Sequence, residues 1–155
     1  MLKYMKSFKQ HIFEKLKVSV RNTTKHTLFP KTKDELKQII EDEISENGNE
    51  CSLNHIDVSK ITDMAELFLG SKFNGDISDW DVSNVKDMSY MFYDSYFTGD
   101  ISDWDVSNVE NMEGMFCGSD FNEDISDWNV SNVSHMKNMF KYSPLENNPP
   151  KWYKS

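Results

Sequence analysis

Acidic side chains recur at fixed intervals through the second half of the chain, and no other residues here have a type and spacing as suggestive of chemistry. They form two columns of a repeat, two residues apart within each unit: Asp57, Asp79, Asp81, Asp103, Asp105, Asp127 and Asn129. Stacked carboxylates can form a solvated face with local hydrogen bonds to serine and backbone, or dock a basic protein partner. Divalent-cation binding is a third interpretation, although no recognised calcium-loop pattern is present.

Other patterns of catalytic residues are missing from the sequence. No two of the four histidines share a repeat column: His11, His26, His55 and His135. There is no Ser–His–Asp order, HExxH, CxxC or glycine-rich phosphate loop. Cys51 and Cys117 occupy non-equivalent columns, so we expect free thiols in a reducing compartment. We therefore predict that the protein is not an enzyme and needs no cofactor or metal.

A strict 24-residue period organises the chain, and four tryptophans mark it: Trp80, Trp104, Trp128 and Trp152. Seven further apolar columns keep the same period, beginning at Phe73, Ile77, Val82, Val85, Met88, Met91 and Phe92. The pattern covers about four units over residues 53–152. One unit cannot bury its own apolar side, so we expect the units to stack around a shared core. An aromatic ladder that binds a ligand is the alternative interpretation.

The pattern within each unit indicates secondary structure. Trp80 and Val82 alternate with aspartates, which is typical of a strand, and the apolar positions from Val85 to Phe92 have helical spacing. We therefore predict an α/β repeat fold, namely a right-handed leucine-rich-type solenoid with about four 24-residue strand–helix rungs. We also expect a column of asparagines to satisfy backbone groups at the strand–helix corner: Asn84, Asn108 and Asn132.

The N-terminal part divides into two segments. Thr32 and Glu35 form a capping-box pattern that predicts a helix over 33–47, which would cap the solenoid assigned to residues 32–155. Residues 1–31 form a basic arm with an amphipathic helix expected over 2–18. Three roles stay open for the arm: packing on the cap helix, docking a partner or acting as a targeting tag, and touching an anionic membrane surface.

Charge and hydropathy narrow the possible environments. The net charge is −9, but residues 1–33 contribute +8, so the rest of the chain carries −17. An acidic body argues against nucleic-acid binding. No apolar run is long enough to span a membrane, and no secretory signal is recognisable. We expect a cytoplasmic protein, or one exposed by a route without a signal peptide.

The run FNGDISDWDVSNVKDMSYMF resembles the repeat of the BspA-like leucine-rich repeat surface proteins, also known as the DUF285-type repeat. This resemblance covers about residues 53–143 and implies a leucine-rich solenoid without shared catalytic residues. For several members it implies adhesion to host or matrix proteins. We therefore predict a non-enzymatic protein–protein interaction or adhesion module that uses the acidic columns. The alternative is an accessory structural subunit of a larger assembly, for instance a viral one, anchored by the N-terminal arm.

Overall fold

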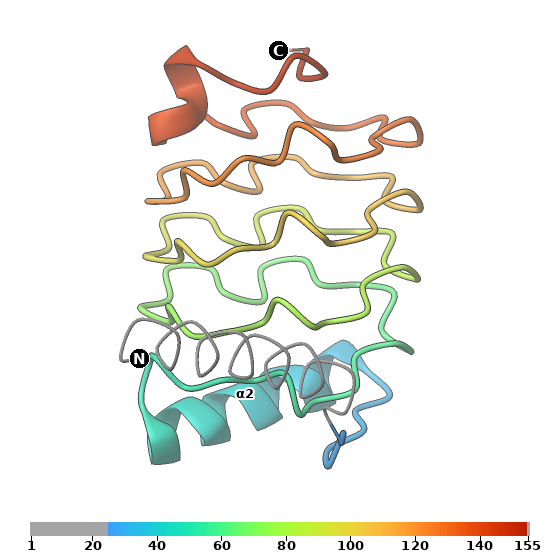
Figure 1. Cartoon of the computed structure of the whole chain (residues 1–155), viewed down its shortest axis with the longest axis vertical. Helices are drawn as coiled ribbons and strands as arrows, with labels where there is room; N and C mark the ends of the chain where they lie inside the picture. Colours follow the sequence, from blue (N-terminus) through green and yellow to red (C-terminus); the bar gives the residue numbers. More distant parts are fainter. Residues whose placement is uncertain (1–24, 155) are drawn as a thin grey trace, which may run out of the picture.

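The computed structural model describes residues 25–154, so the helix predicted over 2–18 lies outside the described residues. Within that range the chain forms one α-helix, α2 (Lys33–Asn47), and one 3₁₀-helix, η1 (Pro144–Asn147). Irregular coils between them lie one above the other along the long axis of the molecule (Figure 1). Isolated parallel bridges, such as the one between Asp87 and Asn111, join neighbouring coils.

Helix α2 spans the predicted range, and its ends follow the local sequence. The Thr32 hydroxyl accepts a hydrogen bond from the Glu35 N–H at 3.2 Å. The Glu35 carboxylate in turn accepts from the Lys31 N–H at 2.7 Å. Gly48, with φ of 85°, ends the helix and donates to the Ile44 carbonyl at 2.8 Å. Each contact satisfies a backbone or capping group that the helix would otherwise leave unpaired.

The 24-residue period corresponds to a physical register between coils. Residues 88, 90 and 92 donate their N–H groups to the carbonyls of residues 111, 113 and 115, at 2.8–2.9 Å. The coils before and after repeat this pattern, so each of these amides bonds to a carbonyl 23 positions later. Equivalent residues therefore lie above one another, and a preference at one position is repeated through the stack.

The predicted α/β repeat, a right-handed leucine-rich-type solenoid of strand–helix rungs, is wrong. Residues 25–154 contain no strand beyond isolated bridge residues, and the segment expected as a repeated helix is a row of overlapping turns. Tyr90 and Asp94 have φ of 55° and 50°, a left-handed conformation that interrupts an α-helix. The N–H groups of Met91 and Tyr93 close four-residue turns, whereas those of Tyr90 and Phe92 donate to the next coil.

The segment expected as a strand also consists of turns. Trp80 donates its N–H to the Ile77 carbonyl at 3.2 Å, and a second turn closes between residues 82 and 85. Side chains here provide much of the bonding between coils: the Trp104 indole N–H donates to the Ile77 carbonyl at 3.2 Å. The Asn108 amide donates to the Ser83 carbonyl at 2.7 Å, and Asn84 and Asn132 make the equivalent bond. The expectation that the asparagine column binds backbone groups is confirmed.

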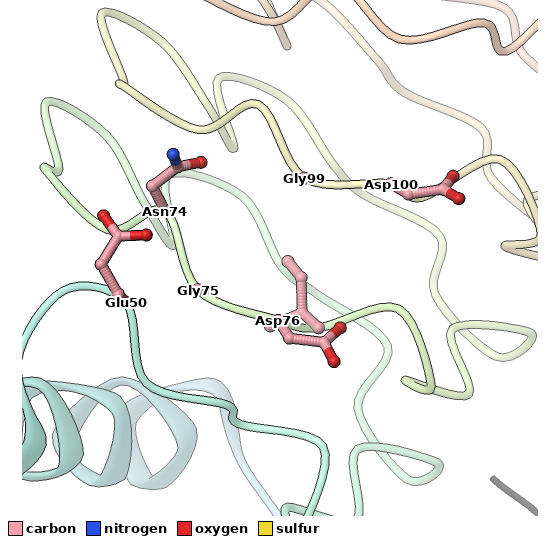
Figure 2. Close-up of a pocket in the computed structure, with 7 residues that line it drawn as sticks. Glu50, Asn74, Gly75, Asp76, Gly99 and Asp100 are labelled. Atoms are coloured by element: carbon pink, nitrogen blue, oxygen red, sulfur yellow. The ribbon is translucent and has the colours of Figure 1, made fainter. Parts of the chain in front are cut away.

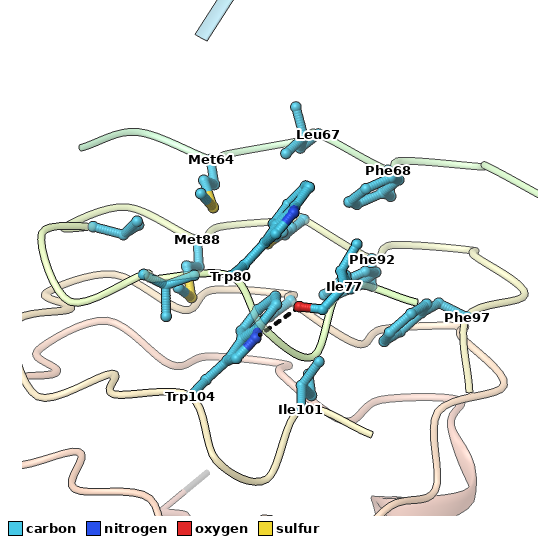
Figure 3. Packing of buried hydrophobic residues seen from close by; sticks show 14 of the residues in the cluster. Met64, Leu67, Phe68, Ile77, Trp80, Met88, Phe92, Phe97, Ile101 and Trp104 are labelled. Carbon is cyan, nitrogen blue, oxygen red and sulfur yellow. Dashed lines mark hydrogen bonds between the residues drawn. The ribbon is translucent and has the colours of Figure 1, made fainter. Parts of the chain in front are cut away.

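The apolar columns line a shared interior, as expected from their period. Trp80 and Trp104 are each 4% exposed, and the phenylalanine column is buried (Figure 3). Stacked rings at positions 68, 92, 116 and 140 are 5.4–5.9 Å apart between centroids and nearly parallel, at 2°. The tryptophan and methionine columns of the internal coils are therefore core residues. Leu36 and Ile40 of α2 join this core at its N-terminal end.

Candidate functional site

The predicted column of Asp57, Asp81, Asp105 and Asn129, which we call the inner column, is built into turns. Asp81 accepts hydrogen bonds from the Ser83 N–H at 3.1 Å and from the Ser83 hydroxyl at 2.6 Å, both on the same carboxylate oxygen, Oδ1. Asp57, Asp105 and Asn129 accept the N–H two residues ahead in the same way, at 3.0–3.2 Å. These are Asx turns, in which an aspartate or asparagine side chain holds the following backbone. The local hydrogen bonds anticipated for this column are present.

Serine contacts also favour the charged form of two of these carboxylates. The hydrogen bond from the Ser107 side chain, and then that from the Ser107 N–H, lowers the pKa of Asp105 below its usual value. The pKa of Asp57 is lowered chiefly by the Ser59 side chain, with smaller contributions from His26 and Lys60. A hydrogen bond donated to the charged form favours that form. Asp57 and Asp105 are therefore held in their charged form more strongly than a free aspartate.

The other predicted column, which we call the outer column, is exposed to solvent. Asp79, Asp103 and Asp127 sit within the first turn of their coils and are all exposed. The backbone N–H of Asp79 donates to the Asn54 side chain of the preceding coil at 3.1 Å, which fixes the turn that carries it. The structure thus places both predicted columns on one short stretch of each coil.

Sequence reasoning missed a third acidic column, which lies five residues before the inner one. Asp76 and Asp100 each accept an N–H at 3.0 Å and a hydroxyl at 2.7 Å from the serine two residues ahead. Asp124 makes the N–H contact at 2.9 Å, and its serine partner lowers its pKa. The signal was available, because D-x-S occurs twice in each of the two units that contain Asp76 and Asp100. We call the three columns together the acidic face: Asp57, Asp76, Asp79, Asp81, Asp100, Asp103, Asp105, Asp124, Asp127 and Asn129.

A shallow pocket of about 320 Å³ opens on the acidic face where two coils meet (Figure 2). Asp76 and Asp100 point to the same side from neighbouring coils, with Glu50 at the rim. A side chain on Gly75 would collide with the Cys51 carbonyl, so this glycine allows the coils to approach closely. The pocket is therefore a notch in an acidic surface.

Both cysteines are free thiols, as expected. Desolvation raises the pKa of Cys117, and it also raises that of Cys51 together with the nearby Glu43 charge. Between residues 25 and 154, no group of three or more histidine, cysteine or acidic side chains is arranged to hold a metal ion. In the same range no helix has both the length and the apolar character needed to cross a bilayer.

Comparison with known proteins places the chain in a family. No curated protein and no solved structure matches it. A family model described as "Mycoplasma protein of unknown function, DUF285" matches residues 34–152, from the first turn of α2 through the last tryptophan. The matched residues make up most of the chain and include the whole acidic face, and the protein is therefore a member of the DUF285 family.

Proposed function

We propose that this protein is a non-enzymatic interaction module that binds a basic protein partner through the acidic face. The observation that carries the proposal is the repetition of the same carboxylates in successive coils, on turns held by serine hydrogen bonds. A rigid array loses little conformational freedom when a partner binds, so more of its electrostatic attraction contributes to affinity.

The spacing of the array suggests what kind of partner fits. Equivalent stacked rings in successive coils have centroids 5.4–6.5 Å apart. Alternate side chains of an extended segment are roughly 6.6 Å apart and point to the same side. An extended segment with Lys or Arg at every second position therefore nearly matches the repeat of the carboxylates. The net charge of −17 over residues 34–155 would also attract a basic partner over longer distances.

The BspA-like resemblance belongs to this proposal, because several such surface proteins adhere to host or matrix proteins. Adhesion would use the same acidic face. The alternative role, an accessory subunit of a larger assembly, would be anchored by the arm of residues 1–31, most of which lies outside the described residues.

Binding of a short peptide of alternating arginine and threonine tests the proposal. The test variant carries Asp→Asn at the four positions we expect to dominate the contact: Asp79, Asp81, Asp103 and Asp105. Asn129 already forms the turn made by Asp81 and Asp105, and Asp79 and Asp103 are exposed, so these substitutions should leave the fold intact. The matched control changes four exposed acids of α2 to their amides: Asp34, Glu41, Asp42 and Glu46.

We expect the test variant to bind the peptide at least about tenfold more weakly, since each surface pair contributes about 0.2–1 kcal/mol. The control should lose much less affinity, although both variants lose the same charge. Wild-type affinity should fall steeply between about 0.05 M and about 0.5 M salt. Equal losses in the two variants, or binding insensitive to salt, would show that the acidic face is not the binding site.

A further inference from the structure

The last coil exposes a surface that every internal coil buries. Three apolar columns are at most 1% exposed in the preceding coil: Val106, Val109 and Met112. Their equivalents in the last described coil are only partly buried, because residues 141–154 do not form a complete further coil over them: Val130, Val133 and Met136. In the described structure, the inter-coil interface is thus partly exposed at residues 130–138.

Backbone groups on this end are also left without a neighbour. At the preceding junction, the Met112 N–H donates to the His135 carbonyl at 2.7 Å, and the Glu110 carbonyl accepts the Ser134 N–H at 2.9 Å. By the same register, the Met136 N–H and the Ser134 carbonyl point away from the stack. Neither group has a hydrogen-bond partner among residues 25–154. We call residues 130–138 the open edge.

Other parts of the two ends pack against neighbouring segments. The Trp152 ring stacks on Trp128 with centroids 6.5 Å apart, and Tyr153 packs edge-on against Phe140 at 5.0 Å. These contacts close the other half of the last coil. At the opposite end, α2 lies across the first coil (Figure 1). Head-to-tail stacking of two molecules would therefore meet α2, whereas two open edges can face each other.

We propose that the open edge is a self-association surface, on which a second copy of the chain docks about a two-fold axis at His135. In an antiparallel pair, N–H and C=O groups flank each residue pair that makes no hydrogen bond itself. The Met136 N–H and the Ser134 carbonyl flank His135 in this way. Each copy then donates its Met136 N–H to the other copy's Ser134 carbonyl, and the exposed sides of Val133 and Met136 become covered. This association does not depend on the acidic face.

Cysteine cross-linking of the full chain tests the register. Across the axis, the two Cα atoms of residue 135 would be about 4.5 Å apart, within the range of about 4.4–6.8 Å that a disulfide spans. Lys137 is the matched control, because it is exposed on the same edge but would lie about 13 Å from its own equivalent. We expect mild oxidation to give covalent dimers of His135→Cys, and not of Lys137→Cys or wild type. Equal cross-linking of both variants, or none in His135→Cys, would overturn the proposal.

Sedimentation equilibrium tests the association itself. We expect a concentration-dependent equilibrium between monomer and dimer. Val133→Lys should weaken it by about tenfold or more, because dimerisation would then bury an unpaired charge. Leu69→Lys is the control, since Leu69 is a half-exposed apolar residue on the first coil. A monomer at all concentrations, or growth into larger polymers, would contradict a closed two-fold dimer. The wild-type measurement and the cross-linking decide the matter even if Val133→Lys fails to fold.

Discussion

Replacing Trp104 with phenylalanine tests how the coils are held together. The indole N–H donates to the buried Ile77 carbonyl at 3.2 Å, and the ring stacks on Trp80 with centroids 6.4 Å apart. Phenylalanine keeps an aromatic ring but loses the donor, which costs about 1 kcal/mol. It also buries roughly 50 Å² less apolar area, which costs about 1.3 kcal/mol before any cavity is counted. We expect the free energy of unfolding to fall by about 2–3 kcal/mol.

Trp152→Phe provides the internal control for this prediction. Trp152 makes the same bond, to the Ile125 carbonyl at 3.1 Å, but is only partly buried on the last coil. We expect a loss of about 1 kcal/mol there. Urea unfolding would be followed by circular dichroism of α2 and by fluorescence of the remaining tryptophans. A loss below about 1 kcal/mol for Trp104→Phe, or equal losses for both variants, would refute the role assigned to the indole ladder.

Two further substitutions test the turns. Ser107→Ala should raise the pKa of Asp105 toward its usual value, measured by carbon-detected NMR titration; an unchanged pKa would contradict the assigned cause. Because the folded-state pKa is lowered, the stability from Asp105 is present above the unfolded value of about 3.9 and is lost as pH falls through the folded-state pKa, so the variant should lose less stability on acidification. Gly75→Ala should destabilise the protein by more than Gly70→Ala: the Gly75 substitution collides with the backbone carbonyl of Cys51, whereas Gly70 has positive φ but open space around it. Gly70→Ala should cost about 1–2 kcal/mol in thermal unfolding, and a cost as large as that of Gly75→Ala would contradict this contact.

The parts of the fold that could be predicted are those determined by single residues or short motifs. The capping pattern at Thr32 predicts where α2 begins, and Gly48 predicts where it ends. Apolar residues repeated every 24 positions predict burial, because an aromatic column is stable only where each ring packs on the next. Neither prediction requires knowledge of the backbone conformation within the coils.

The backbone conformation within each coil could not be predicted from the same pattern. Apolar spacing from Val85 to Phe92 fits a helix, but a row of overlapping turns places the same side chains inward. The deciding conformation is the positive φ at positions 66 and 70 and at their equivalents, which are Glu66, Gly70, Tyr90, Asp94, Gly114, Gly118, Asn138 and Tyr142. Only three of these eight are glycine, so the sequence signal for a left-handed residue is weak.

The acidic face was partly predictable for a related reason. Alternation around Trp80 correctly indicates that Asp79 and Asp81 point outward, since a turn and a strand expose the same positions here. The prediction of a strand assigned no role to Asp76, whose side chain closes a turn of its own. Two D-x-S motifs five residues apart are typical of consecutive turns, and they could have excluded the strand.

Scalar couplings across hydrogen bonds, measured by NMR on the full chain, test the central claim most directly. Stacked coils predict a coupling from the Tyr90 amide nitrogen to the Glu113 carbonyl carbon, and from Phe92 to Met115. Couplings from these amides to carbonyls four residues earlier would instead show helical rungs and contradict the account.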